Sequence, residues 1–233
     1  MVMIMNLFLV FIFIFFIGST LGWAIELIYR RIAHKKWVNP GFLVGPYLPI
    51  YGFGLVALTY IHLLFYGLNL TPVLAILLMG VTMTIIELVG GLISLYNNVR
   101  LWDYSDRWLN YKGIICPLFS VVWTIVGAIY YYFLASPVLY MLNWFSKNLS
   151  FSFVLGLFTG VLIIDFIYST NLYIKINKFA KENEILIKYE KLKMQIKEAQ
   201  EQAKEKYSFL TPFRQTKSLR DYIMEYIENN KRK

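Results

Sequence analysis

Charge is missing from the start of this chain, because residues 1–25 contain no Asp, Glu, Lys, Arg or His. Only 16% of all residues are charged, whereas 58% are hydrophobic. A helix needs roughly 20 predominantly apolar residues to cross the core of a bilayer. The uncharged start therefore predicts a retained membrane helix, since the apolar region of a cleaved signal peptide is only about 7–15 residues long. An ordinary soluble domain is excluded.

Cysteine is nearly absent, since Cys116 is the one cysteine among 233 residues. A single cysteine excludes an internal disulfide and the zinc and redox motifs that need paired cysteines. We expect Cys116 to be a packed apolar residue in a helix. The chain also lacks a G-x-x-x-x-G-K-[ST] phosphate loop, so it cannot hydrolyse ATP alone. The sequence predicts no cofactor.

Long apolar runs are what the chain has instead. Hydropathy places five of them at about 3–28, 48–67, 72–95, 114–135 and 151–174. The expected fold is an all-α polytopic membrane protein with five transmembrane helices. The fall in hydropathy after the last run divides the chain into a five-span membrane domain, residues 1–174, and a basic cytoplasmic helical tail, residues 175–233.

The basic residues are distributed unevenly among the connections between these spans. The first connection carries four, the third carries three and the tail carries fifteen, so five spans place 22 of the 23 on one side of the membrane. The positive-inside rule then predicts an N-terminus outside and a C-terminus in the cytoplasm, in the bacterial cytoplasmic membrane. Attraction to anionic headgroups of the lipid bilayer accounts for the net charge of +9. We expect no nucleic acid as a partner.

Three acidic residues, Glu26, Glu87 and Asp165, lie within apolar segments. A charge at the centre of a bilayer costs about 3 kcal/mol on insertion scales, so such residues face a partner or a wet cavity. Glu26 precedes Arg30 by four residues, a spacing that favours an intrahelical pair, whereas Glu87 has no opposite charge within ten residues. Their common depth permits one acidic cavity open to the cytoplasm. The alternative is three separately satisfied polar contacts.

The first connection has an unusual sequence, W-V-N-P-G-F-L-V-G-P-Y-L-P-I-Y-G-F-G, over residues 37–54. Its prolines and glycines oppose a regular helix, yet much of it is apolar. Irregular backbone at membrane depth is tolerated only against protein or a water-lined cavity. The pattern predicts either a re-entrant element or a tight turn into the second span. Its candidate functional residues are Asn39, Gly41, Gly45, Pro46, Pro49, Tyr51 and Gly52.

The third connection, residues 97–113, combines aromatic side chains with charges. Its candidates are Trp102, Asp103 and Asp106. Asp103 and Arg107 have the spacing of an intrahelical pair. Asp103 and Asp106 suit a hard cation held together with phosphate or water, although two carboxylates do not make a metal site on their own.

Glycines four residues apart let helix backbones approach closely. Such pairs occur at Gly18–Gly22 and Gly156–Gly160, and the third span adds Gly80, Gly90 and Gly91. They indicate that the first, third and fifth spans pack tightly, within one chain or between copies in a homo-oligomer.

The tail carries apolar residues at heptad spacing: Ile185, Tyr189, Leu192, Ile196, Ala199 and Ala203. About three repeats are near the minimum for a coiled coil. The alternative is a single amphipathic helix lying on the membrane. A short second amphipathic stretch follows at 219–227.

The same segments carry a family resemblance. The matching motifs are G-W-A-I-E from Gly22, the long proline–glycine motif from Asn39, Glu87, W-D-Y-S-D from Trp102, Asn110, Gly113 and C-P-L-F-S-V-V-W from Cys116. Over roughly residues 15–140 the chain resembles the bacterial membrane family labelled putative ABC-transporter type IV, or CmpB-like putative ABC transporter permease. It differs at Pro40, where the family usually has Arg.

The resemblance implies a permease, which is the membrane subunit of a transport system and works with a separate ATPase subunit or another energy source. Two alternatives stay open. One is a membrane scaffold or regulator that binds a protein partner through its tail. The other is a lipid-active enzyme that uses Asp103 and Asp106.

Overall fold

The structure is a computed structural model that describes residues 2–35, 37–182, 187–189 and 191–198. Its elements are α1 (Val2–His34), α2 (Pro49–Gly67), α3 (Pro72–Tyr96), β1 (Val99–Arg100), α4 (Pro117–Ile129), the π-helical η1 (Tyr130–Leu134), α5 (Ala135–Lys147), η2 (Leu149–Phe151), α6 (Ser152–Glu182) and β2 (Ile187–Lys188). Residues 191–198 are helical as well. Within these described residues, five segments are long and apolar enough to cross a membrane, which confirms the expected fold class.

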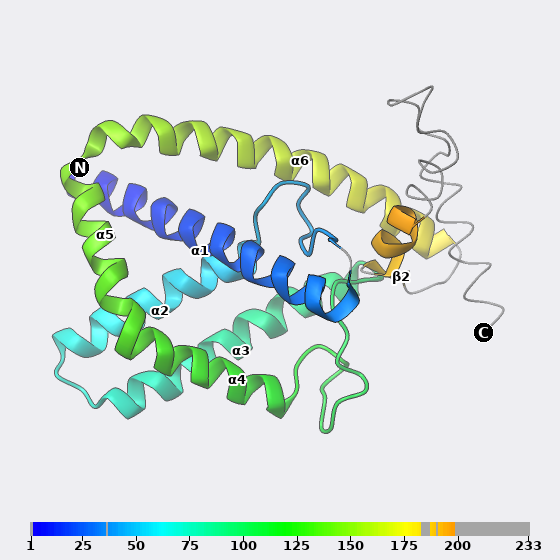
Figure 1. The fold of residues 1–233 in the computed structure, drawn as a ribbon, viewed down its shortest axis with the longest axis horizontal. Coiled ribbons are helices and arrows are strands. Elements are labelled where there is room, and N and C mark those ends of the chain that lie inside the picture. Colours follow the sequence, from blue (N-terminus) through cyan, green and yellow to red (C-terminus); the bar gives the residue numbers. More distant parts are fainter. Residues whose placement is uncertain (1, 36, 183–186, 190, 199–233) are drawn as a thin grey trace.

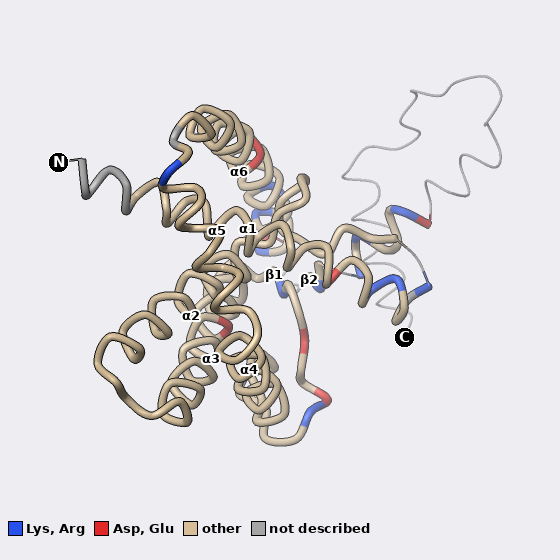
Figure 2. Tube along the Cα trace, turned by 60° about the vertical axis from the view of Figure 1, so that its left-hand side comes forward, with Lys and Arg blue, Asp and Glu red and all other residues tan. Residues whose placement is uncertain are grey.

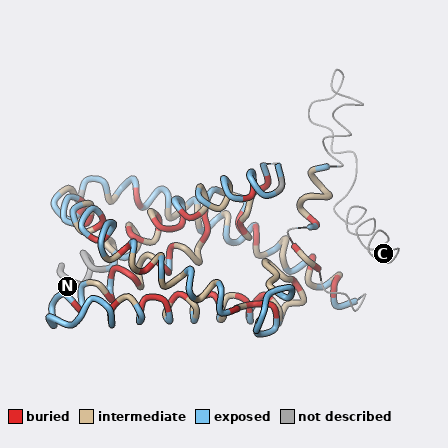
Figure 3. Tube along the Cα trace, turned by 60° about the horizontal axis from the view of Figure 1, so that its bottom comes forward, coloured by how far each residue is buried: buried red, intermediate tan, exposed pale blue. Residues whose placement is uncertain are grey.

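The long helices run back and forth between two ends of a bundle. In Figure 1, α1, α3 and α6 run in one direction, and α2 and the pair α4–α5 run in the other. The C-terminal ends of α1, α3 and α6, residues 97–116 and both strands gather at one end, which we call the basic end. Figure 2 shows most Lys and Arg residues there. Exposed residues follow the outward faces of the helices (Figure 3), as expected for a lipid-facing surface.

The fourth span extends further than its hydropathy suggests. The sequence predicts a connection at 136–150, but α5 continues the helix to Lys147. Pro137 lacks the N–H that would bind the carbonyl of Phe133, which is why a helix is expected to end there. The π segment just before it bonds with the wider spacing, since the Ala135 N–H reaches the Tyr130 carbonyl. The chain therefore bends between α4 and α5 instead of ending (Figure 1).

Glycines bring two pairs of helices into close contact. A Cβ added at Gly22 of α1 would lie 2.3 Å from the Cβ of Tyr51 in α2. One added at Gly80 of α3 would lie 2.1 Å from Oγ1 of Thr124 in α4. Close packing of α1 against α2 and of α3 against α4 therefore depends on these positions.

The glycines of the fifth span do not make such close contacts among the described residues. A Cβ added at Gly156 or Gly160 would meet nothing within 4 Å among the described residues. Of the two alternatives left open for these glycines, the structure does not show packing against a helix of the same chain, because open space lies beside both positions among the described residues. A contact between copies at this face stays a prediction.

The contrast between these glycines gives a stability test. Gly22→Ala should lower the free energy of unfolding by about 1–3 kcal/mol, the usual cost of overpacking, because α1 and α2 must separate. Gly156→Ala should leave it unchanged or raise it by up to about 1 kcal/mol, since its methyl group meets open space and alanine favours a helix over glycine. Thermal unfolding in detergent would measure both. Equal melting temperatures for the two variants would contradict the packing.

The end of α6 and the segment after it form a small second core at the basic end. Val99 of β1, Ile176 and Ala180 of α6, and Ile187 and Leu192 are all buried together. α6 itself runs to Glu182, beyond the expected end of the membrane domain at residue 174.

Three residues of the predicted heptad seam, Tyr189, Leu192 and Ile196, pack into this same core of their own chain. The other three, Ile185, Ala199 and Ala203, lie outside the described residues, as does the stretch 219–227. The coiled coil stays a prediction for the undescribed part of the tail.

Candidate functional site

Residues 37–48 of the first connection fold back into the bundle before α2 begins, and we call them the re-entrant loop. It turns back between α1 and α6 (Figure 1), and the Leu48 N–H donates to the Ser19 carbonyl in the middle of α1 at 2.9 Å. Leu43 and Tyr47 are buried against residues of α1, α5 and α6 such as Phe16. The apolar side chains of the connection are therefore covered by protein, as the sequence predicts for irregular backbone at this depth. None of residues 37–48 is helical.

Asn39 holds the loop together through four hydrogen bonds. Its Nδ2 donates to the carbonyls of Leu43 at 3.0 Å and Val44 at 2.8 Å. Its Oδ1 accepts the N–H of Gly41 and the indole N–H of Trp23, both at 3.0 Å. Every polar group of this amide is used, and Trp23 thereby connects the loop to α1.

Other candidates of this motif make packing contacts or lie at the surface. Gly41 faces the Tyr47 carbonyl, and a Cβ on Gly52 would lie 2.2 Å from Oγ of Ser19. Pro49 occupies the first turn of α2, where its missing N–H costs nothing. Pro46 is exposed.

Asp165 of α6 binds the backbone of the loop. Its carboxylate accepts the Val44 N–H at 3.1 Å, the Gly45 N–H at 2.8 Å and the Ser169 hydroxyl at 3.0 Å. A Cβ on Gly45 would lie 2.8 Å from the carboxylate, so glycine permits the approach. Successive N–H groups form a favourable anion site. Asp165 therefore anchors the loop to α6.

Glu87 of α3 is 4% exposed, and both its carboxylate oxygens accept hydrogen bonds. The hydroxyl of Tyr104, in the third connection, donates to Oε1 at 2.9 Å. The indole N–H of Trp123, in α4, donates to Oε2 at 2.9 Å. Among the described residues no Lys, Arg or His forms an ion pair with Glu87. The partners of this buried carboxylate are thus neutral donors.

Glu26 forms the predicted pair with Arg30 at 3.0 Å, and Arg30 is itself 7% exposed. The other carboxylate oxygen of Glu26 accepts the Tyr51 hydroxyl at 3.2 Å. The Tyr51 ring packs against the Trp123 ring with centroids 6.1 Å apart.

Glu26 and Glu87 consequently belong to one group of side chains, which we call the polar cluster: Glu26, Arg30, Tyr51, Glu87, Tyr104 and Trp123. Burial first, and then the negative charges of Glu87 and Glu26, raise the pKa of the Tyr104 hydroxyl far above its usual value. The charges of both acids thus raise the pKa of the same tyrosine hydroxyl. Asp165 bonds elsewhere, to the re-entrant loop, so the three acids do not share one set of partners.

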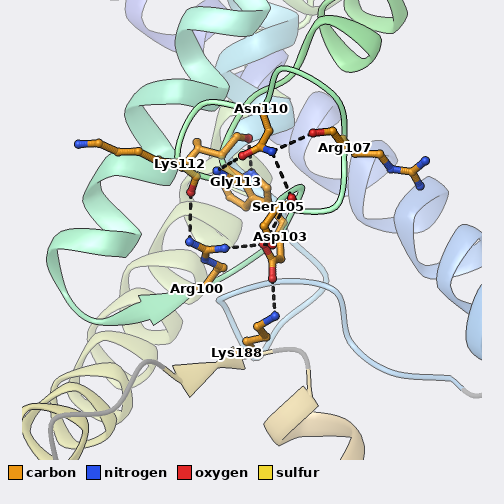
Figure 4. A network of polar contacts seen from close by, with 10 residues as sticks. Arg100, Asp103, Ser105, Arg107, Asn110, Lys112, Gly113 and Lys188 are labelled. Atoms are coloured by element: carbon orange, nitrogen blue, oxygen red, sulfur yellow. Dashed lines mark hydrogen bonds and ion pairs between the residues drawn. The ribbon is translucent and has the colours of Figure 1, made fainter.

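Asp103 is the centre of a second network, shown in Figure 4. It binds Arg100 and Lys188, each at 2.5 Å, and accepts the hydroxyl and N–H of Ser105 at 2.6 and 3.1 Å. The predicted pair with Arg107 is wrong because residues 101–113 are not helical, and Arg107 instead lies 3.9 Å from Asp106.

The two aspartates of this connection do not converge on one point. Asp106 has a side chain that is 76% exposed, whereas Asp103 is directed at Arg100 and Lys188. This geometry disfavours a shared cation and the lipid-active enzyme. Trp102, the third candidate here, donates its indole N–H to the Ile114 carbonyl at 2.9 Å and so closes the connection.

The Asp103 network should make stability depend on pH. Burial would raise the pKa of Asp103, but hydrogen bonds from Lys188, Ser105 and Arg100 outweigh it and hold the pKa far below its usual range. A depressed pKa stabilises the folded protein at pH values above the unfolded-state pKa of about 3.9 and loses that contribution as the pH falls through the folded-state pKa. Wild type should therefore lose its stability advantage over Asp103→Asn below about pH 4. Melting temperatures of both proteins across pH would show this, and a constant difference would contradict it.

Sequence reasoning missed three residues that the structure places at these sites: Tyr104, Trp123 and Lys188. Tyr104 lies between the candidate residues Asp103 and Asp106 in W-D-Y-S-D. Trp123 is the tryptophan that falls well inside a predicted span, whereas interfacial tryptophans gather at span ends. That position was the available signal for a buried hydrogen-bond donor. Lys188 had no such signal.

Comparison with known proteins supports the resemblance seen in the sequence. No curated protein and no solved structure matches the chain. The sequence model of the family described as Putative ABC-transporter type IV matches residues 13–170, which include the re-entrant loop, the polar cluster and Asp165. The chain belongs to this family.

Proposed function

We propose that this protein is the membrane subunit of a transport system and that Glu87 is the centre of its transport path. The observation that carries the proposal is a carboxylate within a membrane helix, 4% exposed, that is bonded only to neutral donors among the described residues. Ionisable residues at membrane depth are costly and typically mark substrate, ion or proton paths. A purely structural contact at this position would be met at lower cost by a neutral side chain.

The hydrogen bonds of Glu87 suit a carboxyl group that gains and loses a proton. A tyrosine hydroxyl either donates or accepts, whereas an indole N–H only donates. An ionised Glu87 accepts from both Tyr104 and Trp123. A protonated Glu87 keeps the bond from Trp123 and donates its proton to the Tyr104 oxygen. Both states therefore fit the same arrangement of heavy atoms, and we infer that Glu87 exchanges a proton during the cycle.

The arrangement of the helices supports an orientation with the basic end in the cytoplasm of a bacterial cell. The Lys- and Arg-rich connections and the segment after α6 lie at that end (Figure 2), as the positive-inside rule requires. The family description supports an ATPase subunit as the partner, which would bind at the same end. A homo-oligomer would use the open face of α6 around Gly156.

The test of this proposal does not require the substrate to be chosen in advance. Solutes would be compared by mass spectrometry in cells and medium, with wild type, with Glu87→Gln and without the protein. A solute whose distribution follows the wild-type protein alone supports transport. In parallel, the tagged protein would be purified in mild detergent. A stoichiometric ATPase supports a permease, and solute profiles identical in all three strains would refute the proposal.

A regulatory or scaffold role through the tail is the second candidate. The observation that favours it is the packing of residues 187–189 and 191–198 against β1 and α6 at the basic end. A chain ending after residue 198 would separate the two functions. Transport should survive this truncation, whereas a scaffold that depends on residues 199–233 would be lost.

A further inference from the structure

Two neighbouring residues of the third connection bind partners on opposite sides. Asp103 accepts the Lys188 ammonium at 2.5 Å, and Lys188 belongs to the segment after α6. Tyr104 donates to Glu87 in α3 at 2.9 Å. Consecutive Cα atoms lie about 3.8 Å apart. Only one peptide unit therefore separates Asp103, which binds the segment after α6, from Tyr104, which binds the buried carboxylate of Glu87.

The described residues 187–189 and 191–198, here called the docked segment, contact both unusual connections. β2 pairs in parallel with β1, and the Ile187 N–H donates to the Asn98 carbonyl at 3.2 Å. The ammonium of Lys193 donates to the carbonyls of Asn39 at 2.5 Å and Gly41 at 2.7 Å. The docked segment thus fixes the third connection and the re-entrant loop at once.

Tyr104 shields Glu87 only while the third connection stays in place. Its ring stacks on Phe119 of α4 with centroids 4.2 Å apart, and its N–H donates to the Gly113 carbonyl at 2.9 Å. Arg100, which also binds Asp103, donates to the Lys112 carbonyl at 3.1 Å (Figure 4). Arg100 thus links Asp103 to Lys112, the neighbour of the glycine whose carbonyl binds Tyr104.

We propose that the docked segment regulates the access of water to Glu87: release of Lys188 from Asp103 frees the third connection and moves Tyr104 away from the carboxyl group. Lys188 is then a positioning residue that acts through Asp103 and Tyr104. This regulation rests on the proposed role of Glu87 in transport, but water access to Glu87 is measurable without transport.

The test is the rate at which a water-soluble carbodiimide modifies Glu87 in the full-length protein in detergent, followed by mass spectrometry of the peptide. Lys188→Glu should raise the rate about tenfold, since a hydrogen bond between charged groups shifts a population by at least that order. Lys188→Arg keeps the charge and should react like wild type. Lys191→Glu, the same charge change at an exposed position of the docked segment, should also leave the rate unchanged.

A second variant covers the case in which Lys188→Glu does not fold. Val99 and Ile187 are paired in the parallel ladder, and neighbouring strands lie about 4.8 Å apart, within the range that a disulfide spans. A protein with Val99→Cys and Ile187→Cys should be modified at Glu87 more slowly when oxidised than when reduced. Equal rates in both forms, or equal rates for wild type and folded Lys188→Glu, would overturn the proposal.

The outcomes also distinguish this proposal from the proposed function. If Glu87→Gln transports normally, Glu87 has no role in transport, yet the carbodiimide rates still report whether the docked segment controls its exposure. If transport needs Glu87 and the rates do not respond to Lys188→Glu, the regulation alone fails.

Discussion

Glu87→Gln should leave the protein folded and reduce transport to the level of cells that lack it. The glutamine carbonyl oxygen accepts the indole N–H of Trp123, and its amide group donates to the Tyr104 oxygen. Both hydrogen bonds of Glu87 therefore survive, and the change in the free energy of unfolding should stay within about 1 kcal/mol. The substitution removes the exchangeable proton and the negative charge alone. Solute distribution in cells and thermal unfolding in detergent measure the two effects.

Glu87→Leu is the matched control for the structural part of this argument. Leucine makes neither hydrogen bond, so Tyr104 and Trp123 lose the acceptor at 2.9 Å that each now has. A buried polar group without a partner costs about 1–3 kcal/mol. Glu87→Leu should thus be both inactive and less stable, whereas Glu87→Gln should be inactive and stable. Full transport by Glu87→Gln would show that the carboxyl group is only a structural hydrogen-bond acceptor.

The sequence predicts contacts between residues that are close together in the chain, and it misses contacts between residues that are far apart in the chain. Five helices follow from hydropathy, and the Glu26–Arg30 pair follows from a spacing of four residues within one helix. The partners of Glu87 lie 17 and 36 residues away in the chain, so no spacing rule identifies them. Only the fold brings α4 and the third connection to α3.

Local rules also fail where they assume the wrong backbone. Asp103 and Arg107 would be neighbours on a helix, but the connection that contains them is irregular. Pro137 would end an ordinary helix, but the π-helical residues 130–134 let the fourth span continue. In both places the observed backbone differs from the one that the local rule assumes.

Asn39→Asp should be among the most destabilising single-atom changes in the chain. The Nδ2 of Asn39 donates to the carbonyls of Leu43 and Val44 at 3.0 and 2.8 Å. An aspartate places a carboxylate oxygen against these two carbonyl oxygens, so two attractive contacts become repulsive. The lost bonds and the new repulsion together should lower the free energy of unfolding by about 2–3 kcal/mol.

The effect of Asn39→Asp should spread beyond the loop, because the same loop backbone binds Asp165 through Val44 and Gly45 and binds Lys193 through Asn39 and Gly41. Asn39→Ala is the matched comparison, since it removes the same bonds without adding a negative charge and should be destabilised less. Thermal unfolding in detergent measures both variants. If Asn39→Asp has the same melting temperature as wild type, the hydrogen bonds of Asn39 do not hold the re-entrant loop. The anchoring of the loop to α6 through Asp165 must then be independent of the Asn39 amide.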